Sequence, residues 1–171
     1  MAIGVLACAL ALSGCIRIAG TFPASVGSDA ATTVVSTPAE QPVTHAVVGE
    51  KLSAGTWTVT VEAAKRTEKS VGDVKPGAGQ EFLTVDVGFE NKGTEALEVR
   101  PQDFKLTDPS GAVVPQAKIS KAAYNANSMR PLLARFGTST VFVYEVPNGL
   151  VRYTFAFLPP GQKTRLEWQV P

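Results

Sequence analysis

Histidine and cysteine are scarce in this chain of 171 residues, which has one histidine, His45, and two cysteines, Cys8 and Cys15. Thiolate and imidazole groups are the usual ligands of zinc, so this count excludes a thiolate zinc site and most transition-metal sites. A catalytic triad needs a histidine oriented by a neighbouring group, and His45 lies beside a segment without a periodic apolar pattern. We therefore expect neither a metal centre of this type nor histidine-based catalysis, and we predict no cofactor.

An excess of charge of one sign is also missing, because Lys and Arg total 16 and Asp and Glu total 15. Proteins that bind nucleic acid usually carry a marked basic excess or a dense basic stripe. The balance gives no reason to expect a nucleic-acid partner, so any electrostatic function has to be local. The length allows one domain of ordinary size.

No apolar run is long enough for a membrane-spanning helix, but the chain starts with a shorter run, Ala2–Leu12. A run of about this length before small residues is typical of a secretory signal peptide and its cleavage site. The first residues, Met1–Gly4, carry no positively charged side chain, so either the true start lies upstream or the signal is atypical. The alternative is a buried N-terminal helix that ends at Gly14-Cys15.

The four residues Leu12, Ser13, Gly14 and Cys15 resemble the lipobox of bacterial lipoproteins. This resemblance implies that residues 1–14 are a cleaved lipoprotein signal peptide and that Cys15 becomes the lipidated first residue of the mature chain. Cys8 would be removed with the signal, so no disulfide is expected. The predicted location is extracytoplasmic, with the protein attached by its N-terminal lipid to the bacterial cell membrane.

Between Ala19 and Thr44 the chain consists mainly of Ala, Ser, Thr, Val, Gly and Pro, with Asp29 and Glu40 as its only charges. Such a composition favours a flexible linker. We therefore predict that residues 15–45 form the lipidated N-terminus and a disordered tether. Flexible-chain scaling gives this tether a span of about 30 Å.

Two segments alternate between apolar and polar residues with a period of two, as half-buried strands do. One apolar face consists of Trp57, Val59, Val61 and Ala63, and the other of Leu83, Val85, Val87 and Phe89. Asn91-Lys92-Gly93 supplies the turn that ends the second strand.

Shorter strands separated by Gly and Pro turns are predicted further along the chain. They lie around Phe104 and Leu106, and at Ala112–Val114, Thr138–Val146, Leu150–Leu158 and Leu166–Val170. Asn148-Gly149 favours a tight hairpin, and only Lys118–Asn127 could form a short helix. Parallel sheets would need crossover helices, so we predict that residues 46–171 are all-β and form an immunoglobulin-like antiparallel β-sandwich.

Seven segments of this region, taken in order, resemble the telokin-like domain of unknown function found in bacterial lipoproteins. They are Val48–Glu50, Trp57–Val61, Gln80–Val87, Glu90–Gly93, Pro101–Leu106, Asp108–Gly111 and Tyr144–Pro147. That group is related in fold to the immunoprotective extracellular proteins of mycobacteria, and the resemblance covers about Val47 to Val170. Arg135-Phe136-Gly137 stands where the family usually has a Pro-Gly turn. The family implies a fold and no common activity, so no catalytic residue is transferred.

Paired carboxylates are the remaining route to catalysis, and the available acids are Asp86, Glu90, Glu98, Asp103 and Asp108. Solvated strand faces and turns commonly carry such residues, so we predict that the protein is not an enzyme. The same acids could form a weak calcium site, although none of them has the spacing of a calcium loop.

The connection from Pro115 to Gly137 carries four basic residues and no acidic one. Its possible ligand-binding residues are Lys118, Lys121, Tyr124, Arg130 and Arg135. Loops on a rigid sandwich often carry binding residues, and guanidinium groups suit phosphate or carboxylate partners. One hypothesis is a membrane-anchored binding module for a protein or an anionic envelope component. The other is a passive structural or accessory surface lipoprotein.

Overall fold

The computed structural model describes residues 41–120, 124, 130–149 and 151–171. The predicted signal peptide, Leu12–Cys15, the predicted tether up to residue 40 and Lys121 lie outside the described residues. The strands are β1 Val43–Val47, β2 Lys51–Ala54, β3 Trp57–Thr67, β4 Gln80–Asn91, β5 Phe104–Thr107, β6 Val113–Val114, β7 Gly137–Pro147, β8 Tyr153–Phe157 and β9 Arg165–Val170, with a 3-10 turn at Pro101–Asp103. None of the described segments is a helix long and apolar enough to cross a membrane.

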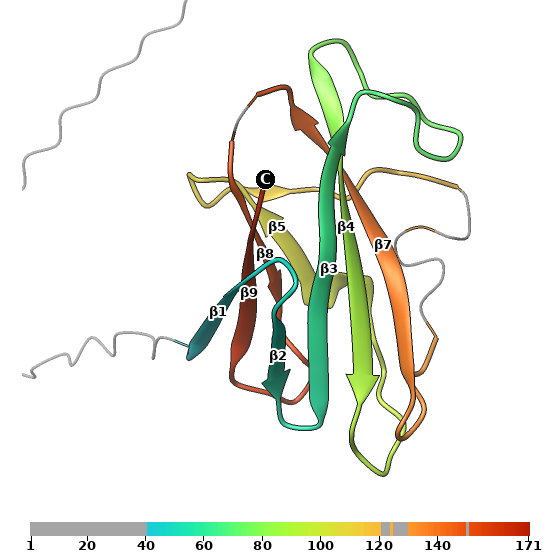
Figure 1. The fold of residues 1–171 in the computed structure, drawn as a ribbon, viewed down its shortest axis with the longest axis vertical. Helices are drawn as coiled ribbons and strands as arrows, with labels where there is room; N and C mark the ends of the chain where they lie inside the picture. Colours follow the sequence, from blue (N-terminus) through green and yellow to red (C-terminus); the bar gives the residue numbers. More distant parts are fainter. Residues whose placement is uncertain (1–40, 121–123, 125–129, 150) are drawn as a thin grey trace, which may run out of the picture. The chain divides into compact units, whose positions relative to one another are not determined.

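The strands form two packed sheets, which Figure 1 shows next to each other. One sheet has the order β1-β9-β8-β5-β6 and the other β2-β3-β4-β7. All pairings between neighbouring strands are antiparallel except β1 with β9, which is parallel. The predicted all-β sandwich is therefore confirmed.

The core between the sheets contains a cluster of aromatic rings from both layers, surrounded by Val, Leu and Ala side chains. Phe104 stacks on Phe157 with ring centres 4.3 Å apart, and it also contacts Phe142 at 4.6 Å. Trp57 meets Phe157 edge to face at 5.4 Å. Stacked and edge-to-face rings contribute beyond the area they bury, so this cluster joins the two sheets without a disulfide among the described residues.

The predicted inner face of β3 is correct up to Val61 and wrong at Ala63. A bulge shifts the register, so that Val61 pairs with Val87 while Ala63 pairs with Asp86. Ala64, not Ala63, then packs against the core. A bulge inserts one extra residue and moves every later side chain to the opposite face. As a result Arg66, two residues beyond Ala64, also lies on the inner side of the sheet.

The β1 strand includes residues 43–45, which the sequence analysis assigned to the tether. Val43 pairs with Arg165 and His45 with Glu167, and the Arg165 amide donates to the carbonyl of Pro42 at 2.9 Å. The sandwich thus begins before the predicted boundary at residue 46. His45 Nδ1 lies 3.3 Å from the Glu167 carboxylate, on an exposed part of this strand.

A second, smaller apolar cluster covers the outer face of the β4-β7 pair. It consists of Val71, Phe82, Ile119 and Val143. The residues come from the β3–β4 connection, the two strands and the segment after β6, so two loops are packed onto the sheet. Tyr124 is half-buried against this cluster.

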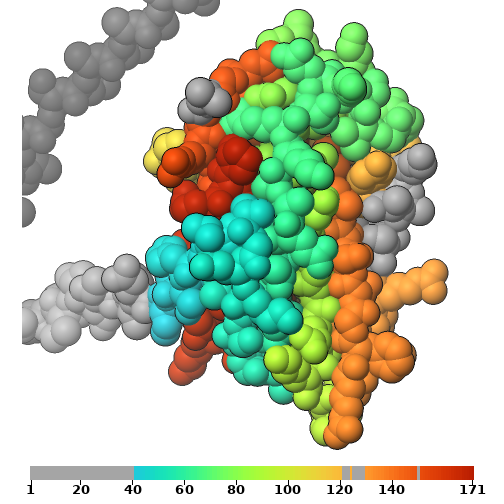
Figure 2. Space-filling model, viewed as in Figure 1, coloured from blue at the N-terminus to red at the C-terminus, as the bar shows by residue number. Residues whose placement is uncertain are grey.

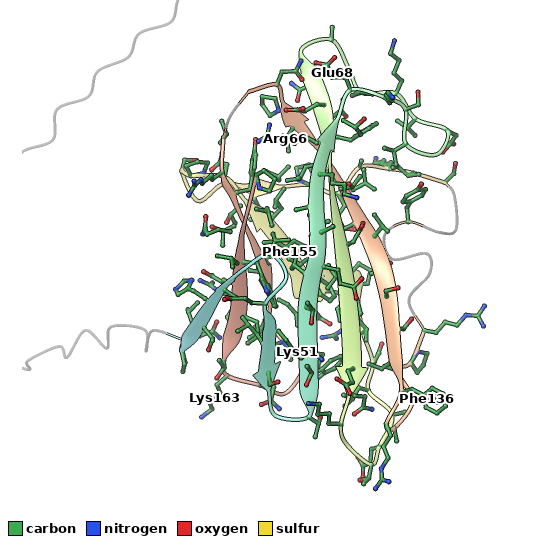
Figure 3. All side chains as sticks on the ribbon, viewed as in Figure 1. Lys51, Arg66, Glu68, Phe136, Phe155 and Lys163 are labelled. Carbon is green, nitrogen blue, oxygen red and sulfur yellow. The ribbon has the colours of Figure 1, made fainter. Side chains whose placement is uncertain are left out.

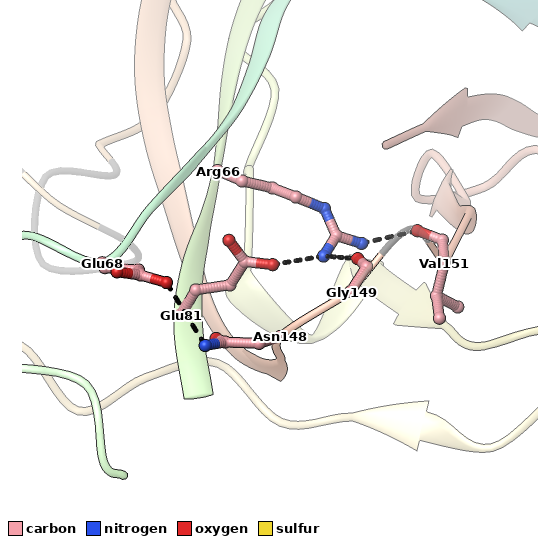
Figure 4. Close-up of polar contacts among 6 residues, drawn as sticks. All are labelled: Arg66, Glu68, Glu81, Asn148, Gly149 and Val151. Carbon is pink, nitrogen blue, oxygen red and sulfur yellow. Dashed lines mark hydrogen bonds and ion pairs between the residues drawn. The ribbon is translucent and has the colours of Figure 1, made fainter. Parts of the chain in front are cut away.

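The tight hairpin predicted at Asn148-Gly149 is wrong, because β7 and β8 belong to different sheets. The connection between them is held by Arg66, which donates to the carbonyls of Gly149 and Val151, each at 2.5 Å. Arg66 also forms an ion pair with Glu81, while Asn148 donates to Glu68 at 3.3 Å (Figure 4). This set of contacts ties the crossing segment to the end of the β3-β4 pair.

Candidate binding surface

The described residues of the predicted basic connection lie at separate places along the edge strand β7 and do not gather at one end of the sandwich. Ala117 donates to the carbonyl of Val143 and Gln116 bridges antiparallel to Tyr144, which places Lys118 beside the middle of β7. Tyr124 bridges to Val141, and Arg135 lies just before Gly137 at the strand's start. With about 3.3 Å per strand residue, Lys118 and Arg135 are roughly 20 Å apart. These residues therefore do not form one charged cluster.

Arg130 and Arg135 both belong to the short segment that precedes β7, although they line different hollows. We call residues 130–137 the Phe136 turn. Arg130 lines a hollow of about 220 Å³ with Leu133 and Phe136. Both arginines are exposed, and neither has an ion-pair partner within the part of the chain that the structure describes.

The Phe136 turn exposes two large apolar side chains, which is unusual for so small a segment. Phe136 is 62% exposed and Leu133 is 57% exposed. In Figure 2 atoms from the chain just before and at the start of β7 project from the edge of the molecule, and Figure 3 labels Phe136 at its lower end. Single exposed apolar residues are common, whereas two in one short turn make the Phe136 turn a candidate binding surface.

Asn91 holds this turn from inside the protein. It is fully buried, and its side-chain amide lies 3.1 Å from the carbonyl of Leu132 and 3.2 Å from that of Leu133. Its backbone amide donates to the carbonyl of Phe136 at 2.9 Å. A buried amide that satisfies several backbone carbonyls fixes the path of a loop. The two apolar side chains are therefore presented by a well-supported turn.

Arg135 adopts a backbone conformation that favours glycine, with φ of 59°. A residue with a Cβ in this left-handed region costs about 1 kcal/mol. Arg135 is therefore strained at a position where glycine would not be, and the nearest glycine in the chain, Gly137, is two residues away. Strained residues of this kind are common at functional sites.

Two polar hollows lie on the outer faces of the sheets. The first, of about 470 Å³, lies over Gly88 and is lined by Lys51, Thr58, Thr60, Glu62 and Arg135 among others. The second, of about 380 Å³, lies on the β5-β8-β9 face and includes Asp103, Lys105, Arg165 and Glu167. In the second hollow both carboxylates already have partners, since Glu167 pairs with Arg165 at 2.6 Å and Asp103 with Arg100 at 3.0 Å.

The carboxylates considered for catalysis or calcium are spread over separate local contacts. Glu90 pairs with Lys51 at 3.6 Å. Asp108 accepts hydrogen bonds from Ser110 and from the amide of Ala112, and the Ser110 hydroxyl holds the pKa of Asp108 below its usual range. Among the described residues no three His, Cys, Asp or Glu side chains are grouped so that they could hold a metal ion.

The sequence analysis missed Leu133, Phe136 and the role of Asn91. It interpreted Asn91 as the first residue of a turn, which it is, because its side chain accepts from the amide of Gly93 at 2.8 Å. The available signal was the segment Pro131-Leu132-Leu133, where two leucines occur in a loop between basic residues. Leu132 is buried and Leu133 is exposed, a difference that the sequence alone does not define.

The described chain is thus a two-layer β-sandwich with an apolar and basic turn that buried Asn91 supports. The chain belongs to the family described as "Domain of unknown function (DUF4352)", whose model matches residues 46–164. The expectation of a β-sandwich family of unknown function is thereby confirmed, while the telokin-like and lipoprotein assignments stay predictions. None of the curated proteins matches this chain.

Solved bacterial structures share the fold at low sequence identity. YcdA of Bacillus subtilis, a proposed lipoprotein, has a TM-score of 0.59 and 17% identity over 70% of this chain, which spans 38% of that protein. The YjhA protein of Bacillus subtilis has a TM-score of 0.58 and 20% identity over 72% of this chain and 98% of its own. MPT63, a secreted protein of Mycobacterium tuberculosis, has a TM-score of 0.53 and 11% identity over 75% of this chain and 97% of its own.

Proposed function

We propose that this protein is an extracytoplasmic lipoprotein, anchored to the bacterial cell membrane through Cys15, whose β-sandwich is a non-catalytic binding module. The lipobox-like Leu12-Ser13-Gly14-Cys15 supports the anchoring. The fold likeness to a proposed lipoprotein and to a secreted protein is consistent with an extracytoplasmic location.

The Phe136 turn carries the binding part of the proposal. Burial of Phe136 and Leu133 against a partner would remove apolar surface from water, at about 25 cal/mol per Å². The unpaired guanidinium groups of Arg130 and Arg135 suit phosphate or carboxylate groups beside such an apolar contact. Because Asn91 holds the turn in position, little conformational entropy is lost on binding.

Anchoring is tested by replacing Cys15 with Ala and comparing detergent-phase partition with that of the parent protein. A diacylglyceryl group gives stable membrane attachment, whereas a chain without lipid lacks that anchor. We expect the parent in the detergent phase with the mass of a lipid on Cys15, and we expect the variant to lack that mass. A parent protein without lipid on Cys15 would refute the anchoring.

The binding role is tested by cross-linking in intact cells, with the variant Phe136→Ser compared with the parent. We expect the parent to give reproducible cross-links from the turn to an envelope component, whether lipid or protein, and the variant to lose them. Val113→Ser is a matched control, because Val113 is 60% exposed but lies on β6. If parent and Phe136→Ser give the same cross-links, the turn is not the binding surface and the passive structural alternative is favoured.

A further inference from the structure

We infer that the Phe136 turn contacts the anionic lipid surface of the membrane that carries the protein, with Phe136 and Leu133 inserted between headgroups and Arg130 and Arg135 on lipid phosphates. This inference rests on the proposed function, because it requires a protein anchored beside that membrane. It goes further by assigning the partner of the turn to lipid.

The first argument is the position of the start of β1. The amide of Arg165 donates to the carbonyl of Pro42, just before β1. Arg165 is also the first residue of β9, directly after the β8–β9 connection. In that connection the Gln162 amide lies so close to Gly55 that a side chain there would meet its Nε2 at 2.6 Å. The start of β1 and the β2–β3 turn are therefore at the same end of the sandwich.

The Phe136 turn belongs to that same end. Lys92 donates to the carbonyl of Thr56, next to Gly55, and the neighbouring Asn91 donates to the carbonyl of Phe136, both at 2.9 Å. Figure 3 labels Phe136 and Lys163 in the lower part of the molecule, on its right and left sides, and Figure 1 shows β1 beginning on the left side. A tether that leads back to a lipid on Cys15 would bring this end toward the membrane, within the predicted span of about 30 Å.

The second argument is charge. Four exposed cations at this end, Lys92, Arg130, Arg135 and Lys163, have no ion-pair partner among the described residues. The exposed acids nearby are Glu95, Glu98 and Glu62, the last lining the same hollow as Arg135, so the four cations outnumber these three acids by one. Membranes with anionic lipids attract such residues, at about fivefold in affinity for each Lys or Arg near the surface.

The third argument is the combination of the two kinds of side chain. An aromatic ring and a leucine beside arginines match the depth profile of a membrane interface, where the apolar part enters the acyl boundary and the cations stay at the headgroups. A protein partner would need further complementary surface, whereas the hollow beside Phe136 is only about 220 Å³.

The test uses the full lipid-anchored chain reconstituted into vesicles of equal phosphatidylglycerol and phosphatidylcholine, in which some lipids carry bromine on their acyl chains. Phe136→Trp reports contact of the turn with lipid, because bromine quenches a tryptophan that reaches the acyl chains. Val113→Trp is the matched control, because Val113 lies away from the Phe136 turn. Val113 pairs with Thr107 at one end of β5, whereas Phe104, at the other end, pairs with Phe157 next to the β8–β9 connection. The native Trp57 and Trp168 are buried and provide a constant background.

We expect quenching of Phe136→Trp and none of Val113→Trp. Adding Arg135→Gly, which suits the local backbone, or Arg130→Gln should lower the ratio of contacting to free turn about fivefold each. Vesicles of phosphatidylcholine alone should lower it further. Equal quenching of both tryptophans, or of neither, would overturn the inference.

A blue-shifted emission at position 136 without quenching by brominated lipid would mean that protein covers the turn, and it would also overturn the inference. Detergent-phase partition of the same samples measures anchoring separately. Retained anchoring with no quenching rejects only the lipid contact, whereas lost partition rejects the proposed anchor itself.

Discussion

Arg66 of β3 and Glu81 of β4 form an ion pair on the inner side of their sheet, with 2.5 Å between Nη1 and Oε1. Their side chains are 14% and 13% exposed. Arg66 also donates to the carbonyls of Gly149 and Val151 and lies 5.5 Å from the centre of the Tyr153 ring. The guanidinium group of Arg66 therefore connects the β3-β4 pair to the β7–β8 connection and to β8 of the other sheet.

Replacing Arg66 with Met should lower the free energy of unfolding by about 2–4 kcal/mol, because it leaves a largely buried carboxylate and two carbonyls without their donor. Lys51→Met is the control, since the Lys51–Glu90 pair is exposed and should contribute less than about 1 kcal/mol. Urea denaturation measures both. Equal stabilities of the two variants would contradict the assigned role of Arg66.

Asn91→Ala should also be destabilising, by about 2–3 kcal/mol, because buried carbonyls of the Phe136 turn lose their hydrogen bonds. Hydrogen exchange at the Phe136 amide, which donates to the carbonyl of Leu133 at 3.2 Å, should become faster.

Asn148→Ala is the matched control for Asn91. Asn148 is exposed and its side chain donates only to Glu68, at 3.3 Å. We expect its removal to change stability by less than about 0.5 kcal/mol. If exchange at Phe136 is unchanged in Asn91→Ala, the turn is held by other contacts.

The phenol of Tyr144 is a different case, because its buried hydroxyl has no hydrogen-bond partner of good geometry among the described residues. Burial raises the pKa of Tyr144 above its usual range, and the side chain of Gln116 opposes this less strongly. A buried polar group without a full partner costs free energy, so Tyr144→Phe should leave stability unchanged or raise it by up to about 1 kcal/mol. Thermal unfolding of the variant measures this, and a loss above 1 kcal/mol would reveal a bond that the structure lacks.

Much of the sandwich follows from sequence because alternation with a period of two depends only on neighbouring residues. The faces of Leu83, Val85, Val87 and Phe89 are predicted correctly, and all four are buried. The position of Ala63 is not, since the bulge before it is a property of the pairing with Asp86 and Val87. A register shift has no local signal in the alternation of a single strand.

The candidate site was predictable only in part, because its residues are brought together by contacts that are distant in sequence. Arg130 and Arg135 were identified from the charge of their connection. The contact that organises them comes from Asn91, whose amide reaches Leu132 and Leu133 across 41 and 42 residues. The Asn148-Gly149 pair illustrates the converse error: a local turn preference predicts a tight bend, but only the sheet order decides which strands it joins.

Acid titration provides the last prediction, at the Asp108–Gly111 turn after β5. The Ser110 hydroxyl donates to Asp108 Oδ1 at 2.6 Å, and the amides of Ser110 and Ala112 donate to the same oxygen. These hydrogen bonds favour the ionised carboxylate and lower its folded-state pKa. The stabilisation is therefore complete above the unfolded pKa and is lost as the pH falls through the lower, folded value.

Ser110→Ala should raise the pKa of Asp108 toward its ordinary value, because it removes the largest of the contributions that lower it. The carboxyl carbon shift of Asp108, followed by NMR from pH 7 downward, measures the change. Ser53→Ala is the control, since Ser53 lies on β2 and bonds to Thr58. An unchanged Asp108 titration in Ser110→Ala would mean that the backbone amides alone hold the carboxylate.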